Sequence, residues 1–315
     1  MTADIAPDVA AYYGTHSDYS DPGSLAARFA DLPTDLALLA RVVRNLLIHR
    51  AEGAMFGRAI AVDRLHHDAE TRYVDGIVRL LVERDGRSLT LPREVGDRFV
   101  GVCRDFALLH CSFLRSAGVP ARIRCGFATY LDADLHSDHV VTEYWDALRG
   151  WRLADPQMAD PRSAAAFGLD FDPMDVPRER FLVAGTAWRA IREGHADPLT
   201  FGHWRPEDPL AGEWFVAQSV RLDVAAVNKA EMLLWDIWGT AEDGYRAVSD
   251  AQRDLYDRVT EAVADEVDFD AARALYSRDD RLRVPRRVWS LAPFSGPAHV
   301  DLRAAPSATD ALVTP

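Results

Sequence analysis

Cysteine is scarce in this sequence: the chain of 315 residues has three. An odd and low number argues against a disulfide scaffold and is typical of proteins in a reducing compartment. The three, Cys103, Cys111 and Cys125, nevertheless all fall within 23 positions. The alternatives for this cluster are a disulfide set, a metal site, a packed core, or one reactive thiol with two bystanders.

Long apolar runs and an excess of positive charge are also absent. No stretch approaches the roughly 18 uncharged apolar residues that cross a bilayer, and the N-terminal residues have no basic segment followed by an apolar one. The formal net charge of −13 would repel a phosphate backbone, which proteins bind through clustered Lys and Arg. We therefore expect a cytoplasmic protein that binds neither membranes nor nucleic acid.

Hydrophobic periodicity predicts helices toward both ends of the chain and a small sheet in the middle. Apolar residues recur at three- and four-residue steps in the helical segments and alternate with polar ones in the strands. We expect the short strands that follow one of these helices to be antiparallel, an arrangement typical of the α+β class. Helices are predicted over 37–49, 69–86, 103–116, 222–239 and 251–265, and strands over 121–131, 138–146 and 150–156.

Two of the cysteines are predicted to be packed hydrophobic residues. Cys103 and Cys111 lie eight positions apart on one predicted helix, which separates them by about 12 Å along its axis, beyond the roughly 7 Å Cα limit for a disulfide. Cys125 alternates with apolar neighbours on one side of its strand, and Cys111 has a similar interpretation. The sequence has no C-x2-C pair, and His136 and His139 supply no second ligand pair, so we expect no metal.

Cys103 differs because it stands where its helix begins. The free backbone N–H groups and the dipole at a helix N-terminus favour a thiolate. A thiolate that attacks a carbonyl needs an imidazole to exchange a proton, and the imidazole needs an acceptor to orient it. His139 follows 36 residues after Cys103, and Asp155 follows 16 residues after His139 at the end of WRLADP. If their strands are neighbours, Cys103, His139 and Asp155 form a catalytic triad.

Four other residues have alternative interpretations. His136 is either a second base or part of a solvated loop. Asp138 is beside His139 in sequence, but strand neighbours point to opposite faces, which makes Asp155 the better partner. Arg122 and Arg124 either bind a carboxylate or phosphate of a substrate or carrier, or form a solvated face paired with acidic residues.

Four short segments carry a resemblance to a known family. GVCRDFA around the cysteine, GVPARIRCGF in the next strand, DHVVTEYW around the histidine and WRLADP around the aspartate resemble the core motifs of the transglutaminase-like superfamily, which shares the papain-like fold. The resemblance implies that Cys103 is the nucleophile, His139 the general base and acid, and Asp155 the residue that orients His139. It implies no cofactor.

The same resemblance suggests how the chain is organised. It implies an N-terminal helical region over 1–90, a papain-like, transglutaminase-like catalytic core over 91–165, and a mainly helical region over 166–300 packed on that core. Residues 301–315 are expected to be a flexible tail.

One departure from the family bears on the reaction. Cross-linking transglutaminases of animals have a tryptophan before the cysteine that helps to stabilise the oxyanion, whereas the first tryptophan here is Trp145. The sequence shows no calcium loop of spaced acidic residues either. We therefore do not expect protein cross-linking, and the second oxyanion donor is not identified.

The expected function is cysteine-dependent acyl transfer through an acyl-enzyme on a thioester or amide. Water as acceptor would make the protein a hydrolase, and an amine would make it an amide-forming acyltransferase. A carbon nucleophile in the same acyl chain would make it a Dieckmann-type cyclase, and the family that the chain resembles includes bacterial cyclases that form tetramate rings in antibiotic biosynthesis. The partner is then a small-molecule or peptidyl acyl substrate, delivered in some of these cases by a carrier protein. A non-catalytic binding module is the alternative from another class.

A mild alkylating agent near pH 6 is expected to label Cys103 before Cys111 and Cys125, because only Cys103 has the features of a stabilised thiolate. Peptide mapping by mass spectrometry after brief treatment checks this. Preferential labelling of Cys111 or Cys125 would contradict the assignment.

Overall fold

The computed structural model describes residues 3–203, 210–239, 246–293 and 295–303. Within them, six strands form a mainly antiparallel sheet in the order β6-β3-β4-β7-β8, with β5 paired to β4. The exception is β7, which runs parallel to β4. The strands of this sheet are β3 (Ala121–Ala128), β4 (His136–Asp146), β5 (Gly150–Ala154), β6 (Phe181–Val183), β7 (Phe201–His203) and β8 (Leu210–Ala211).

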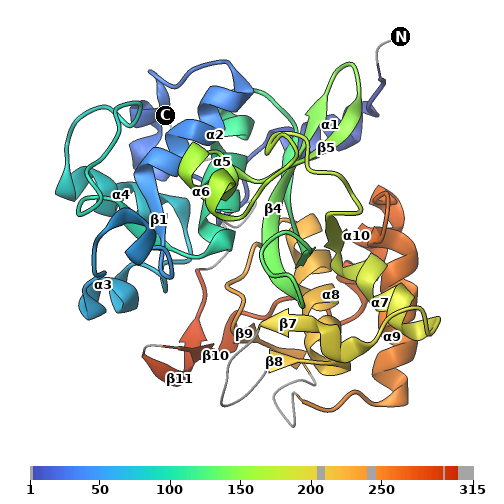
Figure 1. Cartoon of the computed structure of the whole chain (residues 1–315). Coiled ribbons are helices and arrows are strands. Elements are labelled where there is room, and N and C mark those ends of the chain that lie inside the picture. The colour runs from blue at the N-terminus through green and yellow to red at the C-terminus, as the bar shows by residue number, and fades with distance from the viewer. Residues whose placement is uncertain (1–2, 204–209, 240–245, 294, 304–315) are drawn as a thin grey trace.

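Helices cover this sheet from both the N-terminal and the C-terminal parts of the chain. Helix α5 packs against β3 and β4, and helix α8 packs against β3. Figure 1 shows the green strands between the blue and cyan N-terminal helices and the yellow and orange C-terminal ones. The longer helices are α1 (Pro7–Gly14), α2 (Leu36–Leu46), α4 (Val74–Arg84), α5 (Cys103–Ser116), α7 (Ala184–Arg192), α8 (Glu213–Val227), α9 (Asp250–Val263) and α10 (Phe269–Arg278).

Shorter elements complete the chain. The strands β1 (Leu47–His49) and β2 (Phe99–Gly101) pair in parallel, and β9 (Asp236–Ile237), β10 (Arg287–Ala292) and β11 (Gly296–Asp301) form an antiparallel sheet. The short helices are α3 (Val62–His67), α6 (Pro161–Ala166), η1 (Gly23–Phe29), η2 (Ala54–Phe56), η3 (Pro156–Met158) and η4 (Pro198–Thr200). No helix in the described ranges has both the length and the apolar character that a membrane span needs.

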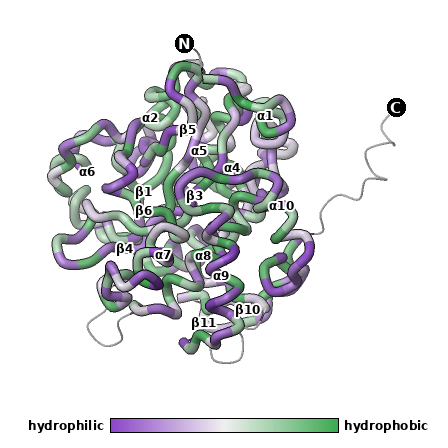
Figure 2. Tube along the Cα trace, turned by 90° about the vertical axis from the view of Figure 1, so that its right-hand side faces the viewer, coloured by the Kyte–Doolittle hydropathy of each residue, from purple (hydrophilic) through white to green (hydrophobic). Residues whose placement is uncertain are grey.

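The hydrophobic core extends through most of the chain. One cluster of buried side chains runs from Tyr19 to Leu302 and is centred on α5, and a second joins Phe127 of β3 to α7, α8 and α9. Figure 2 shows hydrophobic and hydrophilic residues interspersed along α9, whose buried residues include Leu255 and Val259. Helices with one apolar stripe are stable here because the sheet and its neighbours cover that stripe.

The α+β class is confirmed, and the helix expected at 103–116 has these bounds. Two expectations are wrong. The segment 222–239 is not one helix: α8 ends at Val227, after which Lys229 has a φ of 64°, outside the helical region. The strand β3 is buried along its whole length rather than half-buried, because α5 and α8 contact it. Of the expected tail, residues 304–315 lie outside the described residues.

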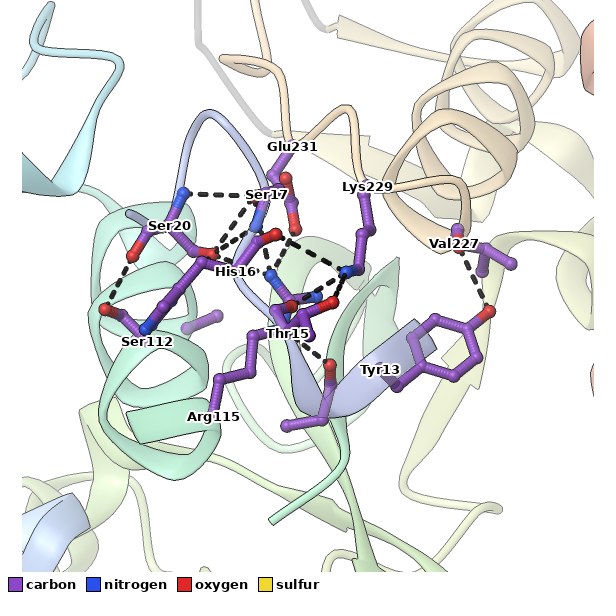
Figure 3. A network of polar contacts seen from close by, with 12 residues as sticks. Tyr13, Thr15, His16, Ser17, Ser20, Ser112, Arg115, Val227, Lys229 and Glu231 are labelled. Atoms are coloured by element: carbon purple, nitrogen blue, oxygen red, sulfur yellow. Dashed lines mark hydrogen bonds and ion pairs between the residues drawn. The ribbon is translucent and has the colours of Figure 1, made fainter. Parts of the chain in front are cut away.

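The turn after α8 belongs to an internal polar network that fastens the N-terminal segment to the rest of the chain. The guanidinium of Arg115 on α5 pairs with Glu231 at 3.0 Å, and both side chains are fully buried. Arg115 also donates to the Ser20 hydroxyl at 2.8 Å, and Lys229 donates to the Thr15 carbonyl at 2.7 Å. Figure 3 shows these side chains converging from α5, the N-terminal loop and the turn after α8.

Replacing Glu231 by alanine is expected to destabilise the protein by about 3 to 5 kcal/mol, because it leaves the buried Arg115 guanidinium without its charged partner. Urea unfolding of Glu231→Ala and wild type measures the difference. The control is Asp280→Ala, which removes a side chain that is 85% exposed and pairs with Arg283 on the surface. That change is expected to cost about 1 kcal/mol or less. Equal effects of the two substitutions would contradict a structural role for the buried pair.

Candidate active site

Cys103 is the first residue of α5. A hydrogen bond within the first turn of the helix and close packing of the preceding glycine fix its position. The Asp105 carboxylate accepts a hydrogen bond from the Val102 backbone N–H at 2.9 Å, which caps the helix. Gly101 is close enough to α5 that a Cβ there would lie 2.9 Å from Asp105 Oδ2 and 3.2 Å from the Phe99 ring. Glycine therefore permits the tight connection from β2 into the helix. The first N–H groups of a helix have no partner within it, so the backbone around Cys103 offers free donors.

His139 lies on β4 and is held against Asp155, which follows β5. Because β4 and β5 are paired neighbours, as the sequence analysis required, the two side chains meet at the same end of the sheet. The His139 Nε2 and Asp155 Oδ2 atoms are 2.8 Å apart. Beside His139 in β3 is Gly126, where a Cβ would lie 2.2 Å from the Leu182 carbonyl oxygen. A glycine there allows β6 to pair with β3 next to the histidine.

Asp155 accepts three hydrogen bonds although its side chain is fully buried. Besides His139, the Tyr130 hydroxyl donates to Oδ2 at 2.7 Å and the Gln157 backbone N–H donates to Oδ1 at 3.0 Å. The Tyr130 ring also lies edge-on to the His139 ring, with centroids 6.0 Å apart. A buried carboxylate remains ionised only when such donors compensate its lost hydration. Tyr130 is thus a positioning residue, which the sequence analysis missed because position in a strand does not reveal what a hydroxyl contacts.

The electrostatics of this pair favour a protonated imidazole. Burial acts to lower the pKa of His139, but the Asp155 carboxylate, its hydrogen bond, and the hydrogen bond and charge of the Cys103 side chain together raise that pKa to about 10. Burial likewise acts to raise the pKa of Asp155, yet the charge and hydrogen bond of His139, with the donors Tyr130 and Gln157, lower it. The dyad is therefore an imidazolium and a carboxylate at neutral pH.

The structure brings the three predicted triad residues together in a nearly dry site. Cys103 is 6% exposed, His139 3% and Asp155 0%. His139 bonds Asp155 at 2.8 Å, and the Cys103 side chain lies close enough to His139 to help raise the pKa of its imidazole. Because electrostatic interactions are stronger away from water, the charge of the dyad acts strongly on groups at this position.

The other two cysteines are buried and far less reactive. The structure has no disulfide among the described residues, and all three thiols are free. Burial raises the pKa of Cys111 to about 12 and raises the pKa of Cys125 well above its usual range. Neither thiol forms the thiolate that nucleophilic attack requires.

His136 and Asp138, which shortly precede His139 in sequence, have structural contacts of their own. His136 is the first residue of β4 rather than part of a loop, and its ring stacks on Phe201 with centroids 4.3 Å apart. Asp138 points away from His139 and lies 3.4 Å from a ring nitrogen of His203. Among the described residues, no three or more His, Cys, Asp or Glu side chains gather in a way that could hold a metal ion.

Arg122 and Arg124 pair with acidic residues, as the second alternative held, but they do not form a solvated face. Both are buried, because Arg122 bonds Glu143 at 2.7 Å and Arg124 bonds both Glu143 at 3.0 Å and Asp223 of α8 at 2.9 Å. Their positive charges are therefore compensated inside the protein. They supply no patch for the carboxylate or phosphate of a substrate, nor for an acidic carrier protein.

Comparison with known proteins agrees with this geometry. Residues 70–156 match the core model of the transglutaminase-like superfamily, a stretch that contains Cys103, His139 and Asp155. The chain therefore carries a domain of the transglutaminase-like superfamily. This match supports a cysteine-based catalytic role.

The other two comparisons add little. A search of curated proteins gave no match. Among solved structures, the chain is similar to a "Putative Cysteine Protease" from Cytophaga hutchinsonii, at 19% identity over 51% of this chain and 50% of that one, with a TM-score of 0.32. The similarity spans about half of that protein's length and is too low to support an argument about fold or activity.

In Asp155→Asn, the pKa of His139 is expected to fall, because burial then acts without the opposing carboxylate. NMR of isotopically labelled histidine at pH 8 should show a protonated His139 in wild type and a neutral one in the variant. Since the folded pKa lies above the ordinary value of 6.5, the stability from this pair is fully present below pH 6.5 and is lost as the pH rises toward 10.

Asp138→Asn is the matched control for this experiment, because it removes the adjacent carboxylate that faces His203 instead. It should leave His139 protonated at pH 8. A neutral His139 in wild type at that pH would show that Asp155 does not hold the proton on the ring.

Proposed function

We propose that this protein is a cysteine-dependent acyl-transfer enzyme that acts on a thioester or amide carbonyl. The single observation that carries the proposal is the arrangement of Cys103 at the start of α5, His139 within electrostatic range of that thiol, and the buried Asp155 hydrogen-bonded to His139. A nucleophile, a base in contact with it and a group that orients the base are what covalent acyl transfer needs.

The reaction begins with attack of the Cys103 sulfur on the carbonyl carbon of the donor. A C–S bond forms, and the π electrons of the carbonyl move to its oxygen to give a tetrahedral oxyanion. When the oxyanion collapses, the bond to the leaving group breaks, and the His139 imidazolium gives its proton to the departing thiolate or amine. The product of this half-reaction is a thioester between the acyl group and Cys103.

Release of the acyl group uses the same residues in reverse. His139, now neutral, takes a proton from the acceptor while the acceptor attacks the thioester carbon. Asp155 keeps the His139 ring in the orientation that both half-reactions need, and Tyr130 and Gln157 hold Asp155 in place. Water, an amine or a carbon nucleophile of the same acyl chain can each serve as acceptor, and the chemistry at Cys103 is common to all three.

The surroundings of the dyad are apolar as well as buried. Cys103 is 6% exposed. Phe181 lies 6.3 Å from the His139 ring and Phe171 lies 5.1 Å from Tyr130, centroid to centroid. Apolar surroundings of this kind keep water away from the reacting groups.

Mixing the protein with acyl thioesters, including β-ketoacyl aminoacyl thioesters, is expected to produce an adduct on Cys103 in intact-protein mass spectrometry. Cys103→Ala should give no adduct. His139→Ala should form it roughly 100-fold or more slowly, because proton transfer by a positioned base contributes at least this much. The matched control is Cys111→Ala, which removes a buried thiol away from the dyad and should react like wild type.

The fate of the adduct identifies the acceptor. Decay to the free acid indicates a hydrolase, decay to a product lighter than that acid by the elements of water indicates a cyclase, and decay only with an added amine indicates amide formation. If neither thioesters nor amides leave an adduct or turn over, the acyl-transfer proposal is wrong.

A further inference from the structure

The strand β1 brings His49 next to the N-terminal end of α5, where Cys103 lies. Strands β1 and β2 run in parallel, and their register places His49 opposite Gly101, two residues before Cys103. The Arg50 backbone N–H donates to the Gly101 carbonyl at 2.9 Å, which extends the pairing past the end of β1. His49 is therefore a strand neighbour of the connection that leads into α5.

The loop that follows His49 is also tied to the other end of the triad. The Glu52 carboxylate accepts from the His49 backbone N–H at 3.1 Å and from the Gln157 side-chain amide at 3.2 Å. Gln157 in turn donates its backbone N–H to Asp155. The buried guanidinium of Arg44, 2.8 Å from Glu52, compensates the charge of that carboxylate. His49 is thus fixed between the segment that carries Cys103 and the segment that carries Asp155.

The hydrogen bonds of the His49 ring determine which nitrogen carries the proton. The Ala51 backbone N–H donates to Nδ1 at 3.2 Å, so Nδ1 must be unprotonated and Nε2 must carry the hydrogen. In the part of the chain that the structure describes, Nε2 has no hydrogen-bond partner. The ring is half-buried by its exposed area. A neutral imidazole whose second nitrogen carries an unbonded N–H is a donor without a native acceptor.

The surroundings keep this ring neutral. Burial and then the charges of Arg50, His139, Arg44 and His203 lower the pKa of His49 to about 3. His49 is therefore neutral at neutral pH and adds no positive charge beside His139. Its Nε2 proton remains available as a hydrogen-bond donor. Because the charge of His139 is one of these causes, the His49 ring lies within electrostatic range of the His139–Asp155 dyad.

We propose that His49 is a catalytic residue whose Nε2–H, together with the Cys103 backbone N–H, donates to the oxyanion that forms when Cys103 attacks the substrate carbonyl. This inference rests on the proposed function. The chain has no tryptophan before Cys103 to act as the second oxyanion donor, and His49 would take that role. Donors of this kind act without reorganisation because the protein holds them in place before the charge develops. No proton leaves His49 in the reaction, and the Ala51 N–H keeps its tautomer fixed.

The variants that test this are His49→Ala, which removes the donor, and His49→Gln, whose side-chain amide can present an N–H near the position of Nε2. Two rates are measured by intact-protein mass spectrometry under single-turnover conditions. The first is acylation of Cys103 by the thioester that acylates wild type best, a reaction that passes through an oxyanion. The second is alkylation of Cys103 by iodoacetamide, a displacement that forms no oxyanion but depends on the same thiolate and imidazolium. Thermal unfolding of each variant checks that it is folded.

His49→Ala is expected to acylate about 100-fold more slowly than wild type, the usual loss for one oxyanion donor, while its alkylation rate stays within about twofold. His49→Gln is expected to recover most of the acylation rate. Equal acylation by wild type and His49→Ala would overturn the inference. So would an equal loss of acylation and alkylation in both variants, which would mean that His49 only positions the dyad.

The two proposals fail in different ways. If wild type forms no acyl adduct with any donor, the proposed function is wrong and the role of His49 falls with it. If wild type and His49→Ala are acylated at the same rate, the proposed acyl-transfer function is retained, and the oxyanion donor is a group other than His49.

Discussion

The arrangement of this protein's site depends on one buried hydrogen bond, between His139 and Asp155. An ionised carboxylate without exposure to water is stable only if donors surround it, and Asp155 has three: His139, Tyr130 and Gln157. His139 lies on β4, Tyr130 follows the end of β3, and Gln157 lies in η3 after β5. The need to satisfy one carboxylate therefore fixes the relative positions of β3, β4 and η3, and with them the direction of the imidazole.

The same constraint recurs in the interior away from the site. Arg115 with Glu231 joins α5 to the turn after α8, and Arg124 with Asp223 joins β3 to α8. Buried ion pairs contribute little net stability, but leaving one partner unpaired costs several kcal/mol, about 3 to 5. Each pair therefore raises the free energy of any arrangement in which its two segments separate. Pairs of this kind fix the positions of α5 and α8 relative to each other and to β3. The Cys-bearing helix and the His-bearing strand are among the elements that they fix.

Acyl transfer at such a site requires negative charge to be accommodated twice, once on sulfur and once on oxygen. The His139 imidazolium provides for the sulfur, because the buried Asp155 keeps the ring protonated. The oxygen needs neutral donors instead, since a second cation close to His139 would weaken the protonation of that ring. A histidine held neutral by burial and by neighbouring positive charges, as His49 is, meets this requirement. His139 and His49 thus take opposite protonation states because their surroundings differ.

The local features of the fold could be read from the sequence. The start of α5 at Cys103, the alternation that gives β3, and the α+β class follow from periodicity and from glycine and proline signals, which depend on near neighbours. The triad could be suggested because His139 and Asp155 stand at the ends of consecutive strands, and consecutive strands usually pair. The expected helix over 222–239 was wrong because Glu231 is held by Arg115, a partner 116 positions away, and the chain turns at Lys229 to reach it.

Only the tertiary structure decided which polar residues belong to the site. Arg122 and Arg124 have the alternating pattern of an exposed face, yet both are buried, where Arg122 pairs with Glu143 of β4 and Arg124 with Asp223 of α8. Tyr130, Gln157 and His49 carry no local signal, because their roles depend on contacts with β5 and on the pairing of β1 with β2. A sequence determines what each segment prefers to form, since those preferences are set by neighbouring residues. Which side chain satisfies a buried charge is decided by segments that meet only when the chain has folded.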